Sequence, residues 1–85
     1  MLTDKELIMS PINWLRWPVL PMKRPDKENK FGIQIGVMRA MSGEIGTTIY
    51  LMGMYSIKEY TDWKKVPKVV YKDVDELLAN GWIVD

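Results

Sequence analysis

The sequence predicts a single small α+β domain over residues 1–85, in which a small antiparallel sheet is built on a central β-hairpin. Three observations carry this prediction. Hydrophobicity alternates with a period of two over residues 31–38, and again over residues 47–55 after a Ser-Gly-Glu-Ile-Gly turn. A capped-helix signal follows over residues 73–81. We therefore expect the hairpin to be accompanied by a short N-terminal helix and one C-terminal helix.

The first thirty residues are expected to form a helix, an extended tryptophan-proline segment and a charged loop. Thr3 and Glu6 have the spacing of a capping box, in which each side chain accepts a hydrogen bond from the other residue's backbone N–H. We expect two short helical turns, or one broken helix, across residues 4–16. Pro18 disfavours helix at the residue before it, so the chain should be extended from there. Residues 24–30 are charged and turn-forming, which is typical of a loop.

The predicted hairpin, residues 31–55, is apolar on both faces. The expected core face consists of Phe31, Ile33, Ile35, Val37, Ile49 and Leu51. The opposite face is also apolar, with Met38, Tyr50, Met52 and Met54. Because monomeric proteins rarely expose large contiguous apolar patches, something is expected to cover this second face. The candidates are the chain's own tryptophan-proline segment lying across it, a second copy of the protein, or a different partner.

The last part of the chain, residues 68–85, predicts a strand, a helix and a final short strand. Asp73 is expected to cap the helix at its start, with acidic residues in the first turn, and Gly81 lies just past its end. A short helical turn is expected before Pro67.

Composition excludes several kinds of chemistry. The chain contains no cysteine and no histidine, which excludes disulfides, zinc-thiolate sites, and Ser-His-Asp or Cys-His catalytic arrangements. The formal net charge of +1 favours no particular partner. No apolar run is long enough to span a membrane, and the N-terminus lacks the pattern of a signal peptide. The expectation is a cytoplasmic protein that is not an enzyme, with no cofactor, no metal and no membrane partner.

The most unusual stretch is Ile-Asn-Trp-Leu-Arg-Trp-Pro-Val-Leu-Pro-Met-Lys-Arg, residues 12–24. In one interpretation it lies across the second hairpin face and buries its large apolar side chains there. In the other, part of the aromatic and methionine set stays exposed as a binding surface, since Trp, Tyr and Arg are enriched at interface hot spots and Met suits adaptable contacts. The candidate partner-binding residues are Trp14, Arg16, Trp17, Tyr50, Met52 and Met54.

Three shorter patterns each have a functional interpretation and a structural explanation. Residues 18–23 match the P-x-x-P-x-K form of a ligand for SH3-type domains, although the prolines also stiffen an extended segment. Basic residues interleaved with tryptophans in residues 14–30 could bind single-stranded nucleic acid. Glycines in residues 42–46 are explained by a turn, and no phosphate-loop or dinucleotide pattern accompanies them.

Residues 70–85, together with the Asn-Trp-Leu-Arg-Trp-Pro-Val-Leu-Pro-Met-Lys-Arg stretch, resemble small uncharacterised proteins of phage and prophage genomes. The resemblance implies a compact accessory or inhibitor protein that binds a host, phage or defence macromolecule, and it brings no catalytic residues with it. The leading hypothesis is a non-enzymatic protein-binding module, whose partner is another protein or, in a homodimer, a second copy of the chain. A protein that sequesters a small molecule or nucleotide is the alternative, and a single-stranded nucleic-acid binder is the less favoured one.

Overall fold

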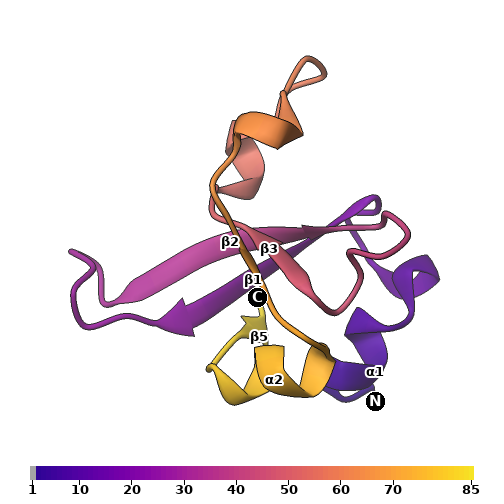
Figure 1. Cartoon of the computed structure of the whole chain (residues 1–85), viewed down its shortest axis with the longest axis horizontal. Helices are drawn as coiled ribbons and strands as arrows, with labels where there is room; N and C mark the ends of the chain where they lie inside the picture. The colour runs from indigo at the N-terminus through magenta and orange to yellow at the C-terminus, as the bar shows by residue number, and fades with distance from the viewer. Residues whose placement is uncertain (1) are drawn as a thin grey trace.

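Five antiparallel strands form one sheet in the computed structural model, which describes residues 2–85, and two short helices pack on one side of it (Figure 1). The strands lie in the order β4-β3-β2-β1-β5. Their bounds are β1 (Val19–Pro25), β2 (Ile33–Arg39), β3 (Thr48–Tyr50), β4 (Lys68–Val70) and β5 (Ile83–Val84). The helices are α1 (Asp4–Ile8) and α2 (Val74–Ala79), and the 3₁₀ turns are η1 (Pro11–Asn13), η2 (Met54–Ser56) and η3 (Trp63–Lys65). The predicted α+β class is confirmed.

Local signals in the sequence place both helices. Thr3 and Glu6 form the expected capping box at α1, each backbone N–H lying 3.2 Å from the other residue's side-chain oxygen. The broken N-terminal helix is confirmed as α1 followed by η1. Asp73 accepts the Glu76 N–H at 2.9 Å at the start of α2, and Gly81 follows the helix with a φ of 92°, a value that favours glycine. The helical turn before Pro67 is η3.

Residues 19–25 of the tryptophan-proline segment form a strand of the sheet, so the interpretation in which this segment lies across a hairpin face is wrong. Residues 19–25 form β1 and pair with β2 along its whole length, with Leu20 opposite Met38. The Asp26 N–H donates to the Gly32 carbonyl at 2.9 Å and closes this hairpin, so the loop begins after β1 rather than at residue 24. An extended chain satisfies more backbone groups by pairing beside β2 than by crossing a face, where its N–H and C=O groups find no partners.

The predicted second strand is shorter than expected. β3 pairs with β2 at Val37 and Tyr50, which confirms that these two segments are antiparallel neighbours, but it ends at Tyr50 instead of residue 55. The Leu51 N–H donates to the Pro67 carbonyl at 2.8 Å, toward β4, and the chain then enters η2. Pairing with β4 has therefore drawn the chain away from β2.

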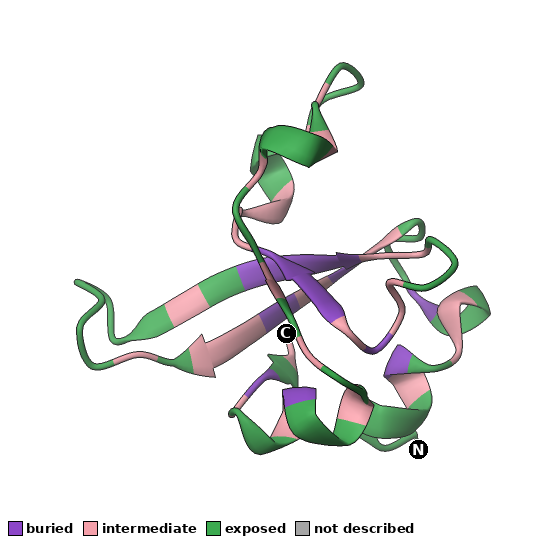
Figure 2. Ribbon diagram, in the orientation of Figure 1, coloured by how far each residue is buried: buried purple, intermediate pink, exposed green. Residues whose placement is uncertain are grey.

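The expected core face of β2 is also wrong, because the helices cover the opposite side. Val37 pairs with Tyr50, so Ile49 shares a face with Met38 and Gly36 rather than with Val37. Ile33 and Ile35 lie on the other face and are exposed, and Phe31 is 81% exposed (Figure 2). The core cluster consists of Ile8, Trp14, Leu20, Met22, Met38, Ile49, Leu77 and Trp82. Neither helix within residues 2–85 has the length and apolarity that crossing a membrane requires.

Gly36 allows this choice of core face. A Cβ atom at this position would lie 2.5 Å from Ile49 Cγ2, 2.9 Å from the Tyr50 carbonyl oxygen and 3.3 Å from Trp82 Cη2. The alternation of large residues predicted the wrong face of β2. The true core face carries Gly36, a small residue, because Trp82 packs directly on the strand at that position.

Gly36→Ala is expected to lower the free energy of unfolding by about 1–3 kcal/mol, because the added methyl group overpacks the core against backbone atoms. Gly53→Ala is the matched control. A Cβ there would lie 3.3 Å from Ile35 Cδ1, the mobile end of a half-exposed side chain, so a change within about 0.5 kcal/mol is expected. Urea denaturation of both variants measures the difference, and equal losses would contradict the assignment of the core face.

Candidate functional site

The outer face of the sheet, defined as the face opposite α1 and α2, is only partly covered. Val37 and Tyr50 are buried on it, whereas Ile33 and Ile35 of β2 are exposed. Its cover comes from residues 51–67, which connect β3 to β4 and rise away from the sheet in Figure 1.

An aromatic and charged cluster holds the 51–67 segment to the sheet. Arg39 Cζ lies 4.6 Å from the centre of the Trp63 ring, and the Trp63 and Tyr50 rings meet edge to face with centres 4.9 Å apart. Arg39 Nη1 donates to the Tyr50 hydroxyl at 3.3 Å and lies 3.6 Å from Glu44 Oε1. The Tyr50 hydroxyl lies 2.7 and 3.0 Å from the two carboxylate oxygens of Glu44. We call Arg39, Glu44, Tyr50 and Trp63 the latch, because they join β2, β3 and η3.

The environment of the latch changes the acidity of Tyr50. Burial raises the pKa of the Tyr50 hydroxyl above its ordinary value, the hydrogen bond to the Glu44 carboxylate raises it further, and Arg39 opposes the change. The folded protein therefore holds this proton more tightly than the unfolded chain does.

This difference predicts a loss of stability in alkali. The free energy of unfolding should fall as the pH rises above about 10, the ordinary tyrosine pKa, because the unfolded chain releases the proton first. Tyr50→Phe should show a weaker fall over the same range, with the other tyrosines contributing equally to both proteins. Urea denaturation between about pH 9 and about pH 11 measures the two slopes. Identical slopes would contradict the buried, proton-retaining state of Tyr50.

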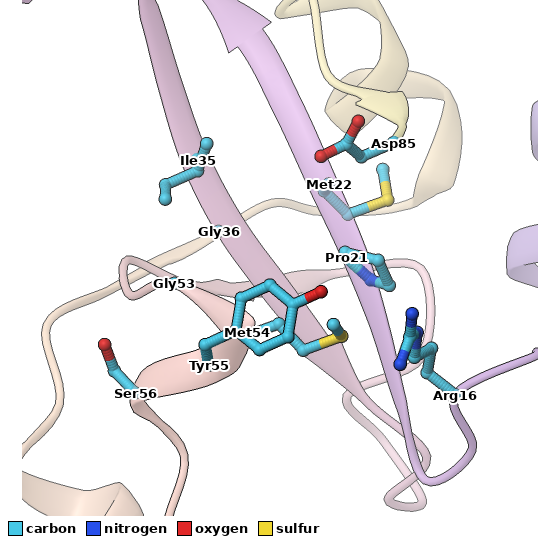
Figure 3. A pocket seen from close by; sticks show the side chains of 10 residues that line it. All are labelled: Arg16, Pro21, Met22, Ile35, Gly36, Gly53, Met54, Tyr55, Ser56 and Asp85. Carbon is cyan, nitrogen blue, oxygen red and sulfur yellow. The ribbon is translucent and has the colours of Figure 1, made fainter.

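The uncovered part of the outer face contains a groove of about 340 Å³ (Figure 3). Pro21 of β1 and Ile35 of β2 form its floor, and Met54 and Tyr55 of η2 form one wall. Arg16, from the turn before β1, and Asp85 also line it. We call this hollow the groove.

A second hollow of about 450 Å³ adjoins the groove. It shares Arg16, Met54 and Tyr55 with the groove, and it is also lined by Val19 and Trp63. The three shared side chains therefore lie between the groove and the second hollow, on the same face of the sheet.

The candidate residues from the sequence divide into two groups. Trp14 is buried, and its Nε1 donates to the Leu7 carbonyl at 2.8 Å, so it belongs to the core, although it also lines a further hollow together with Arg16. Tyr50 is buried in the latch. Arg16 and Met54 line the groove, Met52 is half-buried, and Trp17 is 64% exposed. Of the candidate residues, Arg16 and Met54 therefore meet at the groove.

Sequence reasoning missed Tyr55 and Ile35. Alternation places Ile35 on the expected core face, and Tyr55 is not among the candidate residues, but Tyr55 is 83% exposed and both residues line the groove. Since Gly36 fixes the core face, the small residue next to Ile35 was the signal that could have placed Ile35 outside.

Two charged side chains, Arg16 and Asp85, line the groove. Asp85 is engaged with Lys23, whose Nζ lies 3.2 Å from the carboxylate. Within residues 2–85, no three acidic side chains gather as a cation site would require. Comparison with protein families, with curated proteins and with solved structures found no match to this chain.

Proposed function

We propose that this protein is a non-enzymatic protein-binding module that binds its partner through the groove on the outer face. The observation that carries the proposal is a surplus of apolar surface beside a finished core. Trp82, Met38 and Ile49 are fully buried on the helix side, yet Tyr55 and Ile35 remain exposed around the groove. Apolar side chains that folding does not bury are typical of interaction sites.

Trp17 is an exposed aromatic residue next to this surface in the sequence. It stands in the chain between Arg16 and Pro18, which both line the second hollow, and its side chain is largely exposed. Tryptophan, tyrosine and arginine are the residues most enriched at interface hot spots. This region of the chain thus presents a tryptophan, a tyrosine and an arginine, namely Trp17, Tyr55 and Arg16.

The shape of the groove favours a protein over a small molecule. Pockets for small ligands bury most of the ligand's surface. Here the wall residue Tyr55 projects into solvent and Arg16 is exposed, so the groove would cover only one side of what it holds. A side chain of a larger partner fits such a hollow, with the rest of the partner covering it from outside.

The resemblance to phage and prophage proteins adds the biological class. A small accessory protein of this kind would act by occupying a surface of a host or defence macromolecule. A second copy of the chain is the other partner that the same surface could bind, and the test below separates the two.

The experiment compares Tyr55→Ser with Tyr60→Ser. Both tyrosines lie in the 51–67 segment and are 83% and 85% exposed, but only Tyr55 lines the groove. Each protein is used to capture partners from a bacterial lysate, and its mass is measured by light scattering. Loss of a central aromatic should cost about 2 kcal/mol, which weakens binding about thirtyfold.

Wild type and Tyr60→Ser should hold the same partner, or form the same dimer, while Tyr55→Ser loses it. The proposal is wrong if all three proteins bind equally well, or if none binds a partner and all are monomers.

A further inference from the structure

Arg16 is the arginine without a partner. Arg24 Nε donates to Gln34 Oε1 at 2.8 Å and its guanidinium lies 4.9 Å from the centre of the Trp82 ring. Arg39 is held in the latch. The guanidinium of Arg16, by contrast, makes no hydrogen bond, ion pair or ring contact with any part of the chain that the structure describes, residues 2–85. Its positive charge is therefore available at the surface.

The position of Arg16 couples this charge to the apolar groove. Arg16 lines the groove, the second hollow, and a third hollow of about 310 Å³ beside Leu15 and Leu20. Asp85 lines two of these hollows, and its carboxylate is paired with Lys23. Arg16 is therefore the charged side chain of this site that has no ionic partner within residues 2–85.

We infer that the partner is a protein segment that carries a carboxylate beside large apolar side chains, with the carboxylate paired to Arg16. This inference rests on the proposed function and specifies the chemistry of the partner at the same site. The planar guanidinium can donate two parallel hydrogen bonds to one carboxylate. An apolar side chain enters the groove between Tyr55 and Ile35, and a neighbouring one enters the hollow beside Trp63.

Charge complementarity favours an acidic segment over the other occupants. A segment rich in lysine or arginine would bring a like charge to Arg16 and leave its guanidinium without an anion. A second copy of the chain would offer Phe31, an exposed apolar side chain in the loop between β1 and β2. Lys30 Nζ lies 5.7 Å from the centre of the Phe31 ring. Phe31 would bring a like charge toward Arg16.

The test uses a displayed library of random twelve-residue peptides. The library is selected separately on wild type, Arg16→Gln, Tyr55→Ser and Tyr60→Ser. Arg16→Gln removes the charge of an exposed side chain that has no internal partner, so it should fold as wild type does. Binding of the selected peptides is mapped by NMR shifts of the Ile35 and Met54 methyl groups.

We expect wild type and Tyr60→Ser to enrich peptides with Asp or Glu next to large apolar residues. Arg16→Gln should enrich apolar peptides without the acidic preference, and Tyr55→Ser should enrich few. For one selected peptide, replacing its acid by the amide should weaken binding to wild type about two- to fivefold, the range of an exposed ion pair, and should not weaken binding to Arg16→Gln further.

Three outcomes overturn the inference: enriched peptides that are basic, an acidic preference that survives Arg16→Gln, or no enrichment by wild type. In each case the lysate experiment on Tyr55 still decides the proposed function separately, because it depends on no assumption about the charge of the partner.

Discussion

Trp82→Ala is expected to lower the free energy of unfolding by about 3–5 kcal/mol. Trp82 is fully buried and packs its Cη2 against Gly36, its Nε1 donates to the Tyr71 hydroxyl at 2.9 Å, and Arg24 lies over its ring. Removal leaves a large cavity and an unfilled face of β2. Small domains have only about 5–15 kcal/mol of stability, so a large part would be lost.

Urea denaturation measures this loss, and Trp82→Phe serves as the control. Phenylalanine keeps much of the ring volume but removes the hydrogen bond to Tyr71, so its loss should be smaller than that of alanine. A loss below about 1 kcal/mol for Trp82→Ala would show that Trp82 is not the centre of the core.

Trp14→Ala should cost about as much, about 3–5 kcal/mol, while Trp17→Ala should change stability by no more than about 0.5 kcal/mol. The two tryptophans are three residues apart, but Trp14 is 4% exposed and Trp17 is 64% exposed. Trp14 also donates a hydrogen bond to the Leu7 carbonyl, and this bond would be lost, although the same carbonyl still accepts from the Ser10 N–H at 3.1 Å.

The same denaturation experiment on both variants provides its own control, because the residue type and the substitution are identical. Equal losses would contradict the separation of this stretch into one core residue and one surface residue.

Local signals predicted much of the fold. The capping box at Thr3, the cap at Asp73 and the glycine after α2 depend on neighbouring residues, and each is confirmed. The strand-helix-strand order of residues 68–85 is confirmed for the same reason. These features are local, so the sequence of a few residues determines them.

The pairing between strands that are distant in the sequence was not predicted correctly. The register between β2 and β3 decides whether Ile49 faces the side of Val37 or that of Met38, and alternation alone cannot distinguish the two. Likewise, extended residues 19–25 could cross a face or pair within the sheet, and backbone pairing with β2 on one side and β5 on the other places them within the sheet.

The candidate site was predicted in part for a related reason. Arg16 and Met54 were candidates and line the groove, and Trp17 was a candidate and is exposed. Trp14 and Tyr50 are also aromatic residues, but they are buried, because burial depends on which element each side chain packs against. Residue type identifies candidates for an interface, whereas packing decides which remain available.

The central claim is that folding uses the helix side of the sheet and leaves the groove side free for binding. The most direct test is the free energy of unfolding of the double variant Trp17→Ala/Tyr55→Ser, measured by urea denaturation. Because both side chains are largely exposed, we predict a value within about 1 kcal/mol of wild type. A loss of about 3 kcal/mol or more, equal to that expected for a core tryptophan, would show that the groove residues hold the fold together and would contradict the account.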